Sequence, residues 1–247
     1  MKRKPLTIPE FIDQELKPFS RGDSFRSIPS LIDGFKPTQR KIIYGMLSRG
    51  ENAPIEKVEI LAAQISAKTA YHHGTQSIES TIVGMAQEFT GSNNVNLLVP
   101  AGQFGSRLEP EAAAARYIKS TLHENFRKLF KKEDDILLEE QEEEDKKIEP
   151  VNYFPIIPLV LVNGSKGIGT GYAVSILNRN PKDIQAYLTA ALKGQKKPKR
   201  ILPWYKDYKG KIYENAEGKI IVEGDFTVTN TTTINITEVP KIGRAHV

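Results

Sequence analysis

The chain has 247 residues, a formal net charge of +5 and 39% hydrophobic residues, which suits one large or two modest domains with a real core. It contains no cysteine, which excludes a disulfide framework and a thiolate metal site. No apolar run is long enough to span a membrane. The basic start lacks the apolar stretch of a secretory signal. These features favour a cytoplasmic protein.

Charge is unevenly distributed along the chain. Segment 131–147, KKEDDILLEEQEEEDKK, holds nine acidic residues in seventeen, so the rest of the chain is more basic than the total suggests. A basic body favours a polyanionic partner. The ordinary interpretation of the acidic run itself is a solvated linker or helix face.

Composition divides the chain into regions. A basic arm with one amphipathic segment, IPEFIDQEL, covers 1–22. A compact helical domain covers 23–150 and includes an acidic connector at 131–149. From 151 to 241, alternation and β-branched residues in YFPIIPLVLVNG and KIYENAEGKIIVEGDFTVTNTTTINITEV predict strands. NAEGK predicts a hairpin turn.

Helical spacing in the second region predicts three helices. KPTQRKIIYGMLSRG forms the first and ends at Gly50, and EKVEILAAQISAKTA forms the second. After a break at Gly74, SIESTIVGMAQEF forms the third, with Ser77 as a candidate cap. Its apolar stripe is Ile78, Ile82, Met85 and Phe89. Helix, glycine turn and helix form the outline of a helix-turn-helix.

The next segments predict a wing and a fourth helix. NVNLLVPAGQFGSR is typical of a strand and loop. RYIKSTLHENFRKLF, residues 116–130, predicts a helix whose inward stripe is Ile118, Leu122, Phe126 and Leu129. Tyr117 would then lie at the edge of that stripe, with an anchored backbone and a side chain that can reach solvent or a ligand.

Tyr117 and Arg116 are a candidate nucleophile and its phosphate clamp. A phenol has a pKa of about 10, so it attacks slowly at neutral pH unless positive charge or a base lies nearby. The guanidinium of Arg116 suits bidentate contact with phosphate. On spacing alone, an ordinary structural or interfacial Arg–Tyr pair remains the alternative.

Further candidate phosphate contacts occur in two segments. YHHG places His72 and His73 at a turn, where imidazoles donate to phosphate, shuttle protons or serve as caps and core contacts. Their spacing does not fit zinc. RSIPSLIDGFKPTQRK leads into a helix N-terminus, which favours phosphate, although ordinary surface charge is the alternative. Its basic residues are Arg26, Lys36, Arg40 and Lys41.

LVNGSKGIGTG, residues 161–171, is a glycine-rich loop after an apolar segment. It fits neither the dinucleotide-binding G-x-G-x-x-G pattern nor a P-loop, which argues against a cofactor-binding loop. Ile168 stands between Gly167 and Gly169. An apolar residue on such permissive backbone is a candidate wedge between DNA base steps.

Six ordered segments carry a family resemblance. RSIPSLIDGFKPTQRK, YHHG, GSNNVNLLVPAGQFGSR, ARYI, NYFPIIPLVLVNGSKGIGTGYA and TTINITEVP follow the order and spacing of the DNA breakage–reunion region of type IIA DNA topoisomerases. The chain is similar to the eukaryotic enzyme's central region and to the A-type subunits of gyrase and topoisomerase IV. It most closely resembles the phage-type medium subunit, since neither an ATPase nor a metal-binding domain precedes Met1.

The resemblance implies an α+β fold: a winged-helix (CAP-like helix-turn-helix) domain, then part of an α/β tower. It implies that Tyr117 attacks a DNA phosphodiester and becomes linked to the 5′ phosphate, while Arg116 stabilises the transition state. Arg26 would transfer a proton or stabilise charge. Ile168 would intercalate and bend the DNA, and Asn163 would hold its loop. The implied residues lining the DNA are Lys36, Arg40, Lys41, His72 and His73.

The resemblance also implies partners. The chain shows no ATPase motif and no acidic metal-binding cluster, and EGDF at 223–226 has the wrong surroundings for one. Magnesium and ATP are therefore expected on a partner subunit. The other expected partners are double-stranded DNA and a second copy of the chain, in a bacterial or phage-infected cytoplasm. The terminal IGRAHV, 242–247, indicates a sequencing-adapter artefact after a truncation.

Two other functions remain open from the sequence. A DNA-binding regulator would use only the helix-turn-helix and would form no covalent adduct. A DNA-bending structural protein would use Ile168 and the basic surface and would be indifferent to Tyr117.

Overall fold

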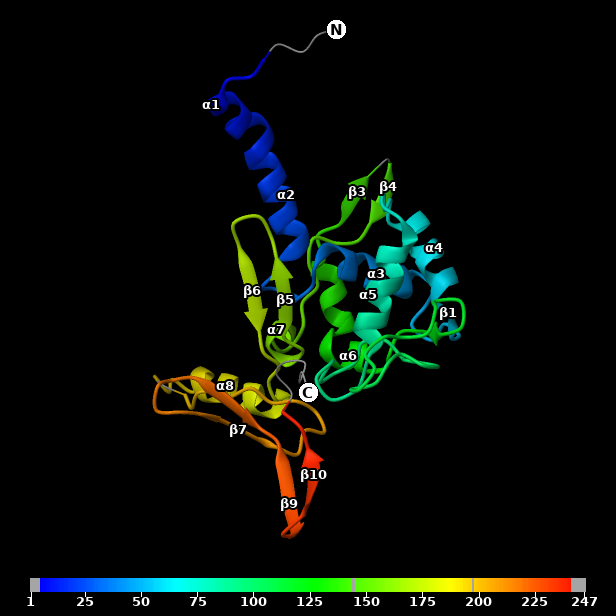
Figure 1. Cartoon of the computed structure of the whole chain (residues 1–247). Helices are drawn as coiled ribbons and strands as arrows, with labels where there is room; N and C mark the ends of the chain where they lie inside the picture. The colour runs from blue at the N-terminus through cyan, green and yellow to red at the C-terminus, as the bar shows by residue number, and fades with distance from the viewer. Residues whose placement is uncertain (1–4, 144, 197, 241–247) are drawn as a thin grey trace.

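A computed structural model describes residues 5–240 apart from 144 and 197. The expected artefact at 242–247 lies outside the described residues. Three consecutive segments form a helical rod at the N-terminus, which projects from the body (Figure 1): α1 (Ile8–Phe11), the π-helix η1 (Ile12–Leu16) and α2 (Lys17–Ser27). Thr7 caps the rod through a capping box with Glu10. The rod passes without a break through the boundary expected at residue 22.

Three helices form the centre of the body, as the sequence predicts. They are α3 (Pro37–Ser48), α4 (Val58–Lys68) and α5 (Thr75–Ala86). Ile78, Ile82 and Met85 are buried as expected. However, α5 ends at Ala86, so Phe89 lies beyond it, and the N-cap is Gly74 rather than Ser77.

The prediction of one helix over residues 116–130 is wrong. Only α6 (Asn125–Leu129) is helical, and β2 (Lys119–Ser120) pairs antiparallel with β1 (Glu56–Lys57). Residues 118, 120 and 122 are buried while 119 is exposed, which is the period of a strand. The backbone groups of this segment bond to neighbouring segments, for instance from Val99 N to Thr121 O, which is why no helix forms here.

The acidic connector is folded against the body. It contains the 3₁₀-helix η2 (Lys132–Leu137) and a hairpin of β3 (Gln141–Glu143) and β4 (Lys146–Ile148). Ile148 and Glu149 are buried. The segment is therefore more than the solvated linker or helix face that its charge suggests.

The part after 150 is less strand-rich than predicted. The apolar run before Asn163 forms a short helix, α7 (Leu159–Val162), which begins after Pro158. Then β5 (Ser165–Ile168) and β6 (Ala173–Ile176) make a hairpin. The helix α8 (Pro181–Leu192) was not predicted; Asn180 caps it by accepting a hydrogen bond from Lys182 N.

Two more hairpins complete the described chain. The first joins β7 (Lys211–Glu214) to β8 (Ile220–Glu223) through the predicted turn, where Gly218 has a φ of 80°. The second pairs β9 (Asp225–Asn230) with β10 (Thr233–Glu238). In the described residues every sheet is a two-stranded antiparallel ribbon. The architecture is mixed helix and strand, as expected.

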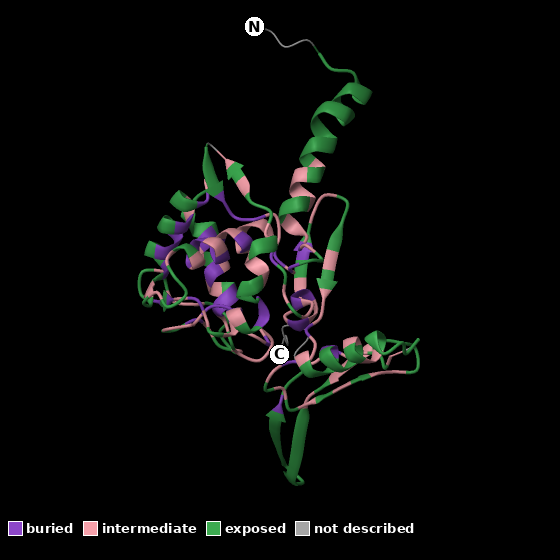
Figure 2. Ribbon diagram, turned by 180° about the vertical axis from the view of Figure 1, so that it is seen from behind, coloured by how far each residue is buried: buried purple, intermediate pink, exposed green. Residues whose placement is uncertain are grey.

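The hydrophobic core is continuous across residue 150. Phe35, Phe126 and Phe130 stack in the helical part, and Tyr153 meets all three rings edge-on. The same cluster continues to Val162 and Ile184. Buried residues concentrate around the helices, whereas the β9–β10 ribbon is almost wholly exposed (Figure 2).

Candidate functional site

Tyr117 lies on an exposed turn with a fixed backbone. Its side chain is 72% exposed, while its neighbour Ile118 is 1% exposed. Tyr117 N donates to Ala114 O at 2.8 Å, and Val58 N donates to Ile118 O at 3.0 Å. The turn precedes β2, whose ladder with β1 fastens it to the body. The expected combination of an accessible phenol and an anchored backbone is present, although a strand anchors it and no helix does.

Arg116 places its guanidinium against the Tyr117 ring. The guanidinium carbon lies 5.3 Å from the ring centroid, in cation–π range. Arg116 is exposed. The turn therefore presents a phenol and a cation side by side to solvent.

Arg26 lies elsewhere in the chain. It is exposed near the end of α2, which contacts α3 and β5, and the nearest carboxylate oxygen of Asp23 is 4.0 Å from its Nη2. Figures 1 and 2 show α2 and β1 on opposite sides of the α3–α5 helices. Arg26 and Tyr117 are therefore not brought together within one copy of the chain.

The structure does not support Arg40 as a DNA contact. Arg40 is buried, and its guanidinium forms two hydrogen bonds with the fully buried Asp33, from Nε to Oδ2 at 2.7 Å and from Nη2 to Oδ1 at 3.1 Å. Asp33 also accepts hydrogen bonds from the backbone of Phe35 and Tyr153. Arg40 therefore forms a buried ion pair with Asp33, which compensates its charge inside the protein.

Lys41 is also engaged inside the protein. Its ammonium donates to Thr69 O at 2.7 Å and forms an ion pair with Glu149 at 2.9 Å. Burial raises the pKa of Glu149, although the bond from Lys41 opposes that shift. Lys41 is half-buried and joins α3 to the end of the acidic connector, and its expected contact with DNA stays a prediction.

The remaining expected contacts lie nearer the surface. His72 is exposed, and its Nε2 donates to Glu143 at 3.0 Å, since an ionised carboxylate only accepts. His73 is exposed, with its ring centroid 5.3 Å from that of Tyr71. Lys36 is half-buried and donates from Nζ to Lys166 O at 2.8 Å, and burial lowers the pKa of its ammonium.

Ile168 is 83% exposed at the end of β5, on the tip side of the β5–β6 hairpin. Its flanking glycines allow close approach to α2, since a Cβ on Gly167 would lie 2.0 Å from Ser27 O. A large apolar side chain thus projects into solvent from a hairpin that is itself held tightly.

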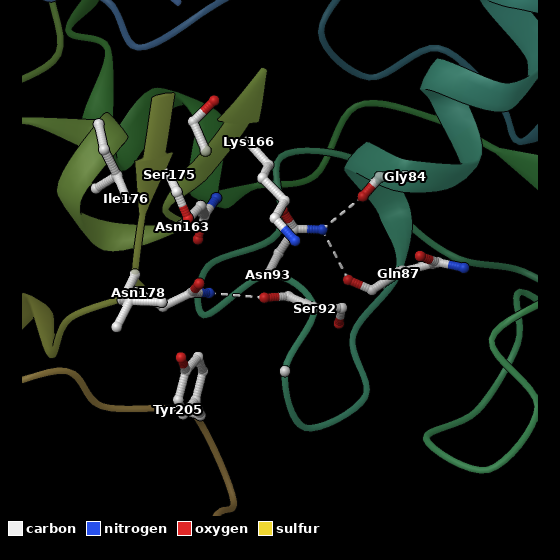
Figure 3. A pocket seen from close by; sticks show the side chains of 13 residues that line it. Gly84, Gln87, Ser92, Asn93, Asn163, Lys166, Ser175, Ile176, Asn178 and Tyr205 are labelled. Atoms are coloured by element: carbon white, nitrogen blue, oxygen red, sulfur yellow. Dashed lines mark hydrogen bonds between the residues drawn. The ribbon is translucent and has the colours of Figure 1, made fainter. Parts of the chain in front are cut away.

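Asparagines fasten the base of this hairpin to the 91–96 loop. Asn163 exchanges two hydrogen bonds with the backbone of Val95, at 2.8 and 2.9 Å. Asn178 donates to Ser92 O, and Asn93 donates to two carbonyls at the end of α5 (Figure 3). These side chains line a cavity of about 470 Å³ into which Lys166 extends. Of these asparagines, only Asn163 was expected to hold the loop, although the asparagine-rich GSNN at 91–94 is a visible signal in the sequence.

The described residues do not supply a metal site. Across residues 5–240, without 144 and 197, no three histidine, aspartate or glutamate side chains are grouped to hold an ion. Among the same residues, no helix is long and apolar enough to cross a membrane.

Comparison of the fold with solved structures defines the class of protein. The chain is similar to the Plasmodium falciparum topoisomerase II DNA-binding, cleavage and re-ligation domain, with a TM-score of 0.88 and 43% identity, over 95% of this chain and 32% of that one. The chain is thus of the type IIA topoisomerase class. Residues 26–244 match the family model that describes the A-type subunits of DNA gyrase and topoisomerase IV, and the chain belongs to that family.

Longer relatives show the same similarity. The chain is 46% identical to DNA topoisomerase 2 of Bombyx mori, over 96% of its own length and 15% of the relative. It is 43% identical to rat DNA topoisomerase 2-alpha, over 95% of its own length and 15% of that protein. With DNA topoisomerase 2 of Acanthamoeba polyphaga mimivirus it shares 43% identity, over 96% and 19% respectively. The chain therefore spans less than a fifth of these relatives.

These relatives do not support two finer expectations. They are eukaryotic and mimiviral enzymes, so neither the closest resemblance to the phage-type protein nor a bacterial or phage-infected host is supported. Each is a much longer single chain, so a separate partner subunit carrying ATP and magnesium is not supported either.

Proposed function

We propose that this chain is the DNA-cleaving part of a type IIA DNA topoisomerase, an ATP-dependent isomerase that breaks both strands, passes a duplex and reseals the break. The observation that carries the proposal is the exposed Tyr117 beside Arg116 on a turn fixed by β1 and β2. A nucleophile that must reach a DNA phosphate needs both the exposure and the rigid backbone.

In the proposed reaction, the Tyr117 Oη attacks a DNA phosphorus as the phenolic proton passes to water. A phosphorus–tyrosine oxygen bond forms, the bond to the 3′ oxygen breaks, and that oxygen takes up a proton. One phosphodiester replaces another, so resealing is the simple reverse and consumes no external energy. The transition state gathers negative charge, which cations positioned beforehand stabilise. Arg116 supplies one such cation.

We propose that the working unit is a homodimer with one Tyr117 for each DNA strand. Within one copy, α2 and β1 lie on opposite sides of the α3–α5 helices, which separates Arg26 from Tyr117. In a dimer, Arg26 of one copy could instead lie near the phosphate that Tyr117 of the other copy attacks. Arg26 would then stabilise charge or transfer a proton there.

DNA would lie across a surface built from a winged-helix arrangement of α4, α5 and the following loops. The proposed contacts are Lys36, His72 and His73, and the proposed wedge is Ile168. Phosphate contacts give steeply salt-dependent binding. Bending the duplex costs on the order of several kcal/mol, which these contacts and the wedge would offset.

Magnesium and ATP hydrolysis would come from outside the described residues. The source is either a separate protein or further parts of a longer chain, as the length of the relatives favours. In both cases the chain contributes the nucleophile, the cations and the DNA surface.

The test is a cleavage assay with Tyr117→Phe. The chain, assembled with the ATPase and metal-binding part of the enzyme, is mixed with supercoiled plasmid and Mg²⁺ or Ca²⁺ and quenched with detergent. A covalent protein–DNA adduct should form with the parent and not with Tyr117→Phe, while both bind DNA equally. If no Tyr117-dependent adduct appears, the enzymatic proposal fails.

Neither rival function forms an adduct, and measurements of binding specificity and of DNA bending separate the two. A regulator would bind a specific sequence without an adduct. A DNA-bending protein would bend DNA equally with Tyr117 or phenylalanine.

A further inference from the structure

The β5–β6 hairpin is held near its tip by the N-terminal rod. Thr170 Oγ1 donates to Asp23 Oδ2 at 2.7 Å, and Ser20 Oγ donates to Thr170 O at 3.1 Å. Lys36, at the start of α3, adds a bond to β5: its Nζ donates to Lys166 O at 2.8 Å. These bonds join residues about 130 to 150 positions apart, so they are made only when the whole fold is assembled.

The glycines of the hairpin make this contact unusually close. A Cβ on Gly167 would lie 2.0 Å from Ser27 O, and one on Gly169 would lie 3.0 Å from Ser24 Cα. Both neighbours are backbone atoms of α2, which cannot swing aside as a flexible side chain can. The hairpin therefore sits backbone to backbone on α2.

Asp23 stands at the centre of this contact. One carboxylate oxygen accepts from Thr170, and the other lies 4.0 Å from Arg26 Nη2. A two-stranded ribbon is only marginally stable alone, and Ile168 lies just two residues from Thr170. A bond at Thr170 therefore limits the positions that the Ile168 side chain samples.

We propose that Asp23 is a positioning residue for DNA bending: through its hydrogen bond with Thr170 it fixes the Ile168 wedge. The inference deepens the proposed function and rests on it for the role of Ile168 in DNA. The docking of the hairpin on α2 is independent of that role.

The first test needs no DNA. Hydrogen exchange of the 165–176 amides is measured in Asp23→Ala, Thr170→Val and the rescue variant Thr170→Ser. Loss of the bond should speed exchange in the hairpin on the order of tenfold, while Thr170→Ser stays near the parent. Asp13→Ala is the matched control, since it removes the same charge from an exposed site of the rod, where Asp13 pairs with Lys17.

The second test measures the bend of a short labelled duplex by FRET, together with binding affinity, in the assembled enzyme. Thr170→Val and Asp23→Ala should lower the bent fraction as Ile168→Ala does, with an unfolding midpoint unchanged from the parent. Asp13→Ala should keep the parent's bend. If Asp23 acted only through its charge, Asp23→Ala and Asp13→Ala would both change the affinity for DNA. Hydrogen exchange of the 165–176 amides would then stay at the parent's rate.

The outcomes separate the inference from the proposed function. Unchanged hairpin exchange in both variants overturns the inference. Faster exchange with a parental bend also overturns it, provided that Ile168→Ala lowers the bend. If Ile168→Ala leaves the bend unchanged, the wedge in the proposed function is itself wrong, and the positioning role falls with it. The Tyr117 adduct is unaffected by that last result.

Discussion

Replacing Arg40 by alanine should destabilise the fold before it affects DNA. Asp33 is 0% exposed and accepts four hydrogen bonds, two from Arg40 and one each from the backbone of Phe35 and Tyr153. Arg40→Ala removes the only cation bonded to this carboxylate within the described chain. Asp33 would then be a buried charge with two neutral donors.

The expected cost follows from that burial. Removing one partner of a buried ion pair costs about 3–5 kcal/mol, because the other charge stays uncompensated. For a chain of this length, each kcal/mol shifts the melting temperature by roughly 2–4 °C. Arg40→Ala should therefore melt about 6–20 °C below the parent.

Thermal and urea unfolding followed by circular dichroism provide the assay. Arg26→Ala is the matched control: it removes the same charge from an exposed site, so its stability should stay within about 0.5 kcal/mol of the parent. If Arg40→Ala keeps the parental stability and loses DNA binding, Arg40 is a DNA contact after all.

Three further predictions concern other residues. Ile168→Ala should reduce DNA bending by FRET without moving the unfolding midpoint, because the side chain is exposed; an unchanged bend would remove Ile168 from the mechanism. Asn163→Ala should cost about 1–3 kcal/mol in urea unfolding, since both backbone groups of Val95 lose their partner; a cost near zero would contradict this. Tyr153→Phe should be neutral or stabilising by about 1 kcal/mol, because the buried hydroxyl has no hydrogen-bond partner among the described residues and burial raises its pKa. A clear loss of stability would show that the hydroxyl is bonded.

Long amphipathic helices were predictable from the sequence. The helices at 37–48 and 75–86 bury residues at helical spacing, and the segment at 58–68 is rich in helix formers. Segment 116–130 was not predictable by the same rule, because buried residues at 118 and 122 satisfy both a helical and an alternating pattern. Neighbouring backbone groups decide between the two, and they are distant in sequence.

The residues of the candidate site were likewise predictable only where their contacts are local in the sequence. An exposed Tyr117 beside Arg116 follows from adjacent residues and is observed. Arg40 could not be told from the surface cations near it, because its partner Asp33 lies seven residues away across an irregular turn. The ion pair between Lys41 and Glu149 was not predictable for a similar reason. Glu149 belongs to the acidic connector, and the composition of the connector does not reveal its path.

One amide side chain joins the two parts of the molecule. Asn94 donates to the carbonyls of Val162, Arg179 and Trp204 and accepts from Lys206 N. The hydrophobic core also continues to Ile184. The part before residue 150 and the part after it are therefore not separable modules. If the chain were divided at residue 150 for expression, each fragment would lose the surface against which it packs. Activity and ligand binding should therefore be measured on the undivided chain.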